Sequence, residues 1–174
     1  MNQQQKTIWT VGHSTHSAEE FLSILKHYYI DLLVDVRRFP GSRKFPQFNR
    51  EVLQNFLIDN GIKYIHLQNL GGRRKPDPDS KNINWRHPAF RAYADFMESE
   101  EFKIGIKELE LLATEKVTSI MCSEVLWWRC HRSMIADQLK ANGWEVVHIL
   151  SKEKSTEHPY TQPAKVVDGE LTYH

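Results

Sequence analysis

The chain has 174 residues, a formal net charge of +1 at pH 7, a hydrophobic fraction of 40% and a charged fraction of 26%. This length and composition fit one globular domain whose core needs no disulfide or metal staple, and the small net charge argues against a general polyanion binder. No apolar run approaches the roughly 18 residues of a membrane span. Because Met1 to Lys6 are also polar, we expect a cytoplasmic protein without a secretory signal or a membrane partner.

The first third of the chain predicts two strands joined by a helix. Residues 7–11 are mostly β-branched or aromatic and run into the turn Gly12-His13-Ser14, as a strand does. A Ser-x-x-Glu capping box at residues 17–20 then precedes apolar residues at helical spacing. Residues 31–37 carry an apolar run without alternation, which is typical of a strand covered on both faces in a parallel sheet.

The middle of the chain predicts a loop, a helix, a third strand and a second, longer loop. Residues 39–48 contain turn residues, and the helix after them begins at Asn49 and ends at Asn60-Gly61. The third strand spans residues 62–67. Residues 73–86 are polar and interrupted by prolines, too long for an ordinary connection, so we expect a functional or mobile loop there.

The remaining chain continues the alternation and ends in a tail. Two helices, a strand, a further helix and a strand are predicted over residues 88–97, 101–114, 117–122, 132–141 and 145–150. The tail from residue 151 onward carries the turn pair Asp168-Gly169 between short β-like segments, which predicts an extended tail or a small hairpin.

Strands that alternate with helices imply βαβ units. We therefore expect residues 1–174 to form a single α/β domain with a Rossmann-like, three-layer architecture. It would contain a parallel sheet of about five strands, with or without an antiparallel edge strand, and helices on both faces. Right-handed crossovers bring the carboxyl end of every strand to one edge of the sheet, where ligand sites in such folds lie.

Four successive strands deliver polar or reactive residues to that edge, which predicts a binding or catalytic site. In chain order the candidates are His13, Ser14, Arg37, Arg38, Ser42, Gly71, Gly72, Cys122 and Glu124, followed by Cys130, His131 and Arg132 at the start of a helix. We expect Arg37, Arg38 and Arg132 to hold an anion, with Gly71-Gly72 letting the backbone approach it and Ser14, Ser42 and His131 as further contacts.

The two cysteines are the candidate reactive groups, because a permanent structural disulfide is rare in a reducing compartment. Cys130 precedes a helix and lies beside His131 and Arg132, all of which lower a thiol pKa and favour a nucleophile. Cys122 is a second candidate nucleophile or redox thiol, although either cysteine could be a small buried hydrophobe. Glu124 and His13 are the candidate proton carriers. As a structural alternative, Glu124 would form an ion pair with Arg37, Arg129 or Arg132.

Charge is unevenly distributed along the chain. Residues 37–50 hold five basic residues and no acidic one, whereas residues 95–115 hold seven acidic residues and two lysines. A local basic patch on a neutral protein favours one anionic ligand over general attraction to nucleic acid, with an uneven solvated surface as the alternative.

Several familiar signatures are missing. The sequence has no dinucleotide-binding glycine motif, no P-loop and no esterase elbow. Cys122 and Arg129 are one residue too far apart for the Cys-x5-Arg loop of tyrosine phosphatases. The cysteines, His13 and His131 lack any recognised metal-ligand spacing, so we predict neither a metal nor a cofactor.

One set of motifs resembles a known family. These motifs are Gly12-His13-Ser14, Asp35-Val36-Arg37, Pro40-x-Ser42, Leu70-Gly71-Gly72, Cys122-x-Glu124 and Cys130-His131-Arg132. In this order they resemble the bacterial and archaeal family called domain of unknown function 488. The resemblance implies a compact α/β domain and carries no established reaction.

We therefore expect an enzyme that acts on an anionic, phosphate-bearing substrate such as a nucleotide or a nucleic acid. A thiol-disulfide or redox-sensing protein that uses Cys122 and Cys130 is the first alternative, favoured by two sulfurs within bonding distance. The second alternative is a non-catalytic nucleic-acid-binding module with stacking aromatic residues, favoured by a flat basic surface. The oligomeric state does not follow from the sequence.

Overall fold

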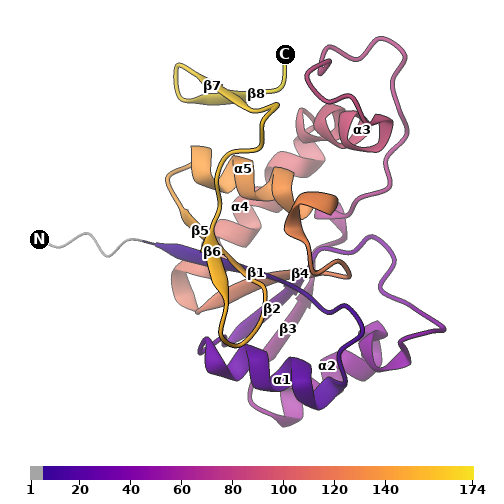
Figure 1. Ribbon diagram of the computed structural model, residues 1–174, viewed down its shortest axis with the longest axis vertical. Coiled ribbons are helices and arrows are strands. Elements are labelled where there is room, and N and C mark those ends of the chain that lie inside the picture. Colours follow the sequence, from indigo (N-terminus) through magenta and orange to yellow (C-terminus); the bar gives the residue numbers. More distant parts are fainter. Residues whose placement is uncertain (1–5) are drawn as a thin grey trace, which may run out of the picture.

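The computed structural model describes residues 6–174 and arranges them around a six-stranded sheet with the strand order β3-β2-β4-β1-β5-β6 (Figure 1). The strands are β1 (Thr7–Gly12), β2 (Leu32–Asp35), β3 (Lys63–His66), β4 (Thr118–Cys122), β5 (Glu145–Ile149) and β6 (Ser155–Glu157). The first five residues, on which the expectation about a secretory signal mainly depends, lie outside the described residues.

Five of the six strands are parallel to their neighbours, and only β6 pairs with β5 in the antiparallel direction. The predicted α/β class is therefore confirmed, with β6 as an antiparallel edge strand beyond the five that the sequence indicates. The central strands are buried almost throughout; every residue of β2 and β4 is buried. This burial on both faces explains why their sequences are apolar without alternation.

Helices cover both faces of the sheet, as Figure 1 shows. The helices are α1 (Ala18–His27), α2 (Arg50–Asp59), α3 (Pro88–Met97), α4 (Glu100–Glu115) and α5 (Arg132–Ala141). One core packs α1 and α2 against side chains such as Leu33 of β2, and the other packs α3, α4 and α5 against the neighbouring Leu32 and Val34. Successive β2 residues thus face opposite cores, as the pleat of a strand requires.

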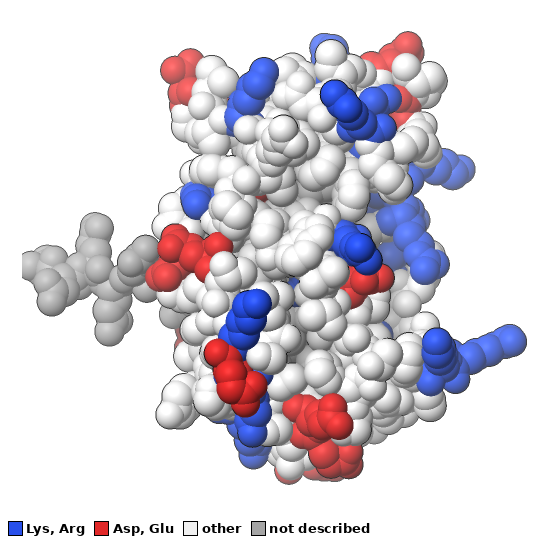
Figure 2. All heavy atoms as spheres, in the orientation of Figure 1, with Lys and Arg blue, Asp and Glu red and all other residues white. Residues whose placement is uncertain are grey.

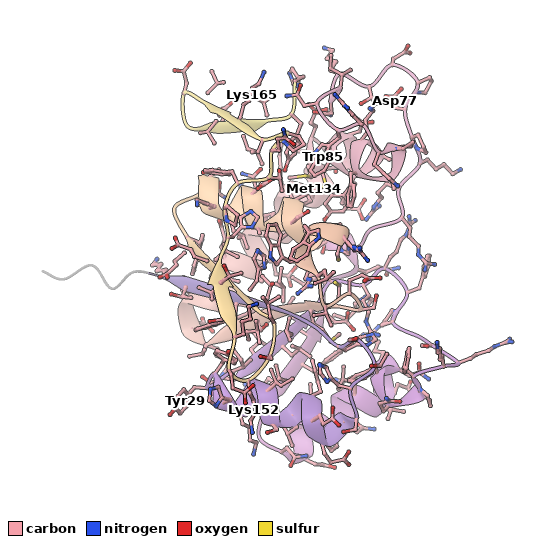
Figure 3. The ribbon with its side chains drawn as sticks, in the orientation of Figure 1. Tyr29, Asp77, Trp85, Met134, Lys152 and Lys165 are labelled. Atoms are coloured by element: carbon pink, nitrogen blue, oxygen red, sulfur yellow. The ribbon has the colours of Figure 1, made fainter. Side chains whose placement is uncertain are left out.

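The C-terminal residues fold back over this second core. A hairpin of β7 (Lys165–Val167) and β8 (Glu170–Thr172) turns at Asp168-Gly169, whose φ angles of 52° and 81° suit a tight hairpin turn. The loop before α3 meets this tail, since the Trp85 ring lies 5.7 Å from the ring of Tyr173. Figure 3 shows Trp85 between the hairpin, which carries Lys165, and α5, which carries Met134.

None of the helices within residues 6–174 has the length and apolar character needed to cross a membrane.

Candidate functional site

A cavity of about 940 Å³ opens at the edge of the sheet where β1, β2 and β4 end. Ten of the twelve predicted site residues line it, namely His13, Ser14, Arg37, Arg38, Ser42, Gly72, Cys122, Glu124, Cys130 and His131. Gly71 and Arg132 are not part of the lining. Residues far apart in sequence meet here because the carboxyl ends of parallel strands share one edge.

Gly12 allows the loop after β4 to cross the end of β1. A Cβ atom at residue 12 would lie 1.8 Å from the Glu124 carbonyl oxygen, a separation that no side chain can tolerate. Backbone hydrogen bonds hold the two segments together, with the amides of His13 and Ser14 donating at 2.9 Å to the carbonyls of Cys122 and Ser123. The glycine therefore places Ser14 and Glu124 on the same cavity wall.

The Gly71-Gly72 pair serves a similar packing purpose. A Cβ at Gly71 would lie 2.7 Å from the Arg38 Cα, and a Cβ at Gly72 would lie 3.1 Å from the His131 Nδ1 atom. The structure thus gives Gly71 a role in chain packing in place of the predicted ligand contact. Gly72 does line the cavity, and its missing side chain leaves room for the imidazole of His131.

Ser42 belongs to the basic loop after β2. Its hydroxyl accepts a hydrogen bond from the Phe45 amide at 3.0 Å, and its own amide donates to the Asn49 side chain at 2.6 Å. Asn49 occupies the predicted N-cap position of α2 but makes no side-chain capping bond there. The two side chains instead give this loop its shape.

Arg37 is held in a buried ion pair. Its Nε and Nη2 atoms donate to the two carboxylate oxygens of Asp35 at 2.9 and 2.7 Å, and Nη2 also donates to the Phe48 carbonyl at 2.8 Å. Tyr64 donates a further hydrogen bond to Asp35. Burial opposes the charge of Arg37, but hydrogen bonding to Asp35 outweighs it and raises the arginine pKa. Of the three guanidinium nitrogens of Arg37, only Nη1 makes no contact with Asp35 and faces the cavity.

The Nε2 atom of His13 lies 3.4 Å from the Nη1 atom of Arg37. The Nδ1 atom of the same ring lies 2.9 Å from the Ser14 carbonyl, so Nδ1 carries the proton and Nε2 is the acceptor. Burial lowers the pKa of His13 to about 4. The neutral ring thus accepts from the Arg37 guanidinium through Nε2, and the role of His13 as a proton carrier stays a prediction.

Both cysteines lie at the buried floor of the cavity, with their sulfur atoms 2.7 Å apart. The Nδ1 atom of His131 is 3.5 Å from the Cys130 sulfur, and its Nε2 atom is 2.9 Å from the Val36 carbonyl. The carbonyl requires a proton on Nε2, which leaves Nδ1 free to accept the thiol proton of Cys130. His131 thus contacts the thiol through Nδ1, and burial lowers the pKa of its ring. It also lines the cavity, where its role as a substrate contact stays a prediction.

The two thiols have opposite pKa shifts. Burial raises the pKa of Cys122 well above its ordinary value. Burial also opposes ionisation of Cys130, but the hydrogen bond from Cys122 and the charge and amide of Arg132 outweigh it and lower the Cys130 pKa to about 7. Within this pair Cys130 is therefore the thiol that ionises more readily, and Cys122 is the one that keeps its proton.

Arg132 does not reach the cavity, contrary to the predicted anion contact. It is completely buried, and its Nη2 donates to the carbonyl oxygens of Glu124 and Val125 while its backbone amide donates to the Cys130 sulfur at 3.5 Å. The Glu124 side chain is exposed, and within residues 6–174 it forms no ion pair with Arg37, Arg129 or Arg132. The expected ion pair is thus replaced by a contact to the Glu124 backbone.

Basic side chains predominate around the opening. The lining contains Arg37, Arg38, Arg73 and Arg129 against one acidic residue, Glu124. Figure 2 shows Lys and Arg side chains along the right-hand margin of the molecule, where the loops after the strands lie in Figure 1. Ser14 and Arg73, both in the lining, have left-handed backbone conformations with φ of 47° and 58°. Non-glycine residues adopt such strained conformations mainly where the surrounding structure needs them.

A family model described as "Domain of unknown function DUF488" matches residues 17–139. The chain belongs to this family. No curated protein and no solved structure matches the chain. The DUF488 span includes the cysteines, His131 and the arginines of the cavity, but His13, Ser14 and the C-terminal tail lie outside it.

The cavity lining also contains residues that are not among the twelve predicted site residues, including Phe39, Arg73, His87, Tyr93, Trp128 and Arg129. Arg73 follows Gly72 directly, and Trp128 and Arg129 lie between the two cysteines. Their proximity in sequence to predicted site residues could therefore have indicated that they line the cavity. No comparable signal marks His87 and Tyr93, which reach the cavity because α3 packs beside the site.

Proposed function

We propose that this DUF488 protein is an enzyme in which the thiolate of Cys130 attacks an anionic, phosphate-bearing substrate. The environment of the Cys130 sulfur carries the proposal: Cys122 lies 2.7 Å from it, His131 Nδ1 lies 3.5 Å from it, and an amide donates to it. A low-pKa thiol, an adjacent proton acceptor and a cavity to hold the substrate are the parts that nucleophilic catalysis needs.

The charge of the lining supports an anionic substrate. Arg73 and Arg129 are exposed at the cavity, where they can bind phosphate oxygens. Phe39 and Trp128, which are 60% and 50% exposed, offer aromatic faces that suit the base of a nucleotide. A concave site weighs against the alternative of a non-catalytic module with a flat basic surface.

The proposed reaction balances as a hydrolysis. The proton of Cys130 passes to His131 Nδ1, the sulfur forms a bond to phosphorus, and the bond from phosphorus to the leaving oxygen breaks. The leaving group takes the proton from His131. Water then cleaves the sulfur–phosphorus bond, which releases phosphate and restores the thiol.

Alkylation with a charged and a neutral reagent tests this proposal. Cys130 should react with iodoacetate and iodoacetamide near neutral pH, with mass spectrometry and Cys130→Ser locating the label. The ratio of the iodoacetate rate to the iodoacetamide rate should exceed that of free glutathione, because the arginines attract the anionic reagent. Phosphate should slow the reaction. Cys130 that is inert in the folded protein, yet labelled after denaturation, would refute the proposal.

The 2.7 Å separation of the sulfurs favours a second candidate, a dithiol reductase. Cys130 would attack the disulfide of an anionic substrate and release one thiol; Cys122 would then attack the mixed disulfide and release the other. The sulfurs need approach by only about 0.7 Å to form a bond of about 2.05 Å. An external dithiol would restore the reduced pair.

Incubation with glutathione disulfide separates the two candidates. The reductase predicts a protein species that lacks two hydrogen atoms and has no free thiol, and this species should not form in Cys122→Ser. Loss of Cys130 reactivity without that species would contradict the reductase and leave the hydrolase.

A further inference from the structure

A chain of buried side chains links the candidate site to the C-terminal tail. Arg132 Nη1 lies 3.2 Å from the Thr10 hydroxyl, which lies 2.6 Å from His148 Nδ1. His148 Nε2 lies 2.8 Å from His158 Nδ1, and His158 Nε2 lies 2.8 Å from an Asp137 carboxylate oxygen. Each of these five side chains is at most 1% exposed.

The hydrogen bonds of this chain all run in one direction. Asp137 can only accept, so His158 must donate from Nε2 and accept at Nδ1, and His148 must then do the same. The Thr10 hydroxyl donates to His148 and accepts from Arg132. Burial lowers the pKa of His148 to about 2, with the neighbouring His158 and Arg132 adding to the effect, so this ring is neutral.

The two ends of the chain carry opposite buried charges. Asp137 also accepts from the Thr161 amide at 2.9 Å and from the Tyr173 hydroxyl at 2.8 Å, so hydrogen-bond donors surround its carboxylate. Arg132 forms no ion pair with any residue in the described range 6–174. Along this series of hydrogen-bonded side chains, the negative charge that balances Arg132 is therefore that of Asp137. The polarised hydrogen bonds between them transmit the interaction.

The same chain contacts the loop of the site at a second point. The Trp127 ring stacks on His148 with a centroid distance of 4.4 Å and an interplanar angle of 5°. Trp127 lies in the segment between Cys122 and Cys130. This segment is thus fixed by Arg132 at its start and by His148 further along.

We propose that Thr10, His148, His158 and Asp137 form a polar relay that positions Arg132, and through it the Cys130 thiolate and the loop over it. The relay residues are positioning residues and do not touch the substrate. This inference rests on the proposed function, in which Cys130 is the nucleophile. The titratable or charged groups that act on Cys130 itself are Cys122, His131, Arg132 and Tyr93.

A matched pair of substitutions at Thr10 tests the relay. Thr10→Val keeps the shape and removes the hydroxyl, so Arg132 loses an acceptor, whereas Thr10→Ser keeps the hydroxyl. The pH dependence of Cys130 alkylation is measured in each protein, with the melting temperature as a measure of stability. In Thr10→Val the pH midpoint of Cys130 alkylation should rise by about one unit. At a pH below the midpoint this corresponds to a roughly tenfold slower reaction. Thr10→Ser should retain the wild-type midpoint.

An unchanged midpoint in folded Thr10→Val would overturn the relay, since a merely structural hydroxyl affects stability alone. If that variant does not fold, nitrogen NMR of the wild-type protein decides: the His148 ring should be neutral with its proton on Nε2, and His158 should donate to Asp137 from Nε2. Any other tautomer overturns the relay. Inert Cys130 in the wild-type protein would instead refute the proposed function, so the two failures are distinguishable.

Discussion

Arg37 and Asp35 form a buried, two-point ion pair in which Nε and Nη2 of the arginine contact both carboxylate oxygens, at 2.9 and 2.7 Å. The carboxylate is completely buried, and the arginine is 9% exposed. The positive charge of Arg37 is therefore largely balanced by Asp35 within the protein. A ligand in the cavity meets an arginine that is rigid and already partly neutralised.

The pair predicts a large stability loss on single substitution. Arg37→Ala should lower the free energy of unfolding by about 3–5 kcal/mol, because it leaves the Asp35 charge buried without a partner. Urea denaturation measures the change. The double variant with Asp35→Ala should lose less than the sum of the two single losses. Strict additivity would contradict the close coupling of these residues.

Binding of an anion predicts thermal stabilisation. Phosphate or sulfate should raise the melting temperature, because a ligand that binds only the native state stabilises it, by about 2.7 kcal/mol at 100 times Kd. Arg129→Ala should diminish this increase, since Arg129 lines the cavity and is exposed. Lys165→Ala is the control, because Lys165 lies on the C-terminal hairpin (Figure 3). Equal loss in both variants would indicate general charge screening.

The close approach at Gly12 predicts that an added methyl group disrupts the site. Gly12→Ala should lower the free energy of unfolding by about 3 kcal/mol or more, since its Cβ would collide with the Glu124 backbone. Gly41→Ala should change it by less than about 0.5 kcal/mol, because the nearest atom to its Cβ lies 4.0 Å away. Urea denaturation compares them. Similar losses would show that the crossing of the two segments is not tight.

Two buried histidines predict that stability falls as the pH is lowered. The pKa values of His13 and His148 are about 4 and about 2, below the value of 6.5 expected in the unfolded chain. Below about pH 6.5 the unfolded state binds more protons than the folded state. For each histidine, the free energy of unfolding is therefore highest above about pH 6.5 and decreases by about 1.4 kcal/mol per pH unit below it. Urea denaturation between about pH 7 and pH 5.5 measures the loss. His13→Gln should reduce the pH dependence, and a constant stability over this range would contradict the assignment.

Much of the fold was predictable because its signals are local. The capping box at Ser17, whose side chain accepts from the Glu20 amide at 3.1 Å, and the Asp168-Gly169 turn each depend on a few neighbouring residues. The convergence of the cavity residues followed from a rule about parallel strands. The strand β6 escaped prediction because three exposed or half-buried residues carry no apolar pattern.

Side-chain roles were less predictable, since they depend on contacts across the sheet. The sequence places Arg132 next to Cys130, but only the packing shows that its guanidinium points toward Thr10, 122 residues away. His148 and His158 lie in segments with no motif, so nothing in the sequence connects them with the site. The sequence puts His131 beside Cys130, but its hydrogen bond to Val36, which fixes the tautomer, requires the structure.

The position of β1 has a consequence for biosynthesis. This N-terminal strand lies between β4 and β5, so its two partners follow it by more than a hundred residues in the chain. Both edges of β1 therefore stay unpaired until the ribosome has made β4 (Thr118–Cys122) and β5 (Glu145–Ile149). Such non-local pairing slows folding and leaves apolar strand edges open to aggregation. Because Tyr173 also contacts Asp137, the polar relay behind the cysteine pair is complete only after synthesis has passed residue 173.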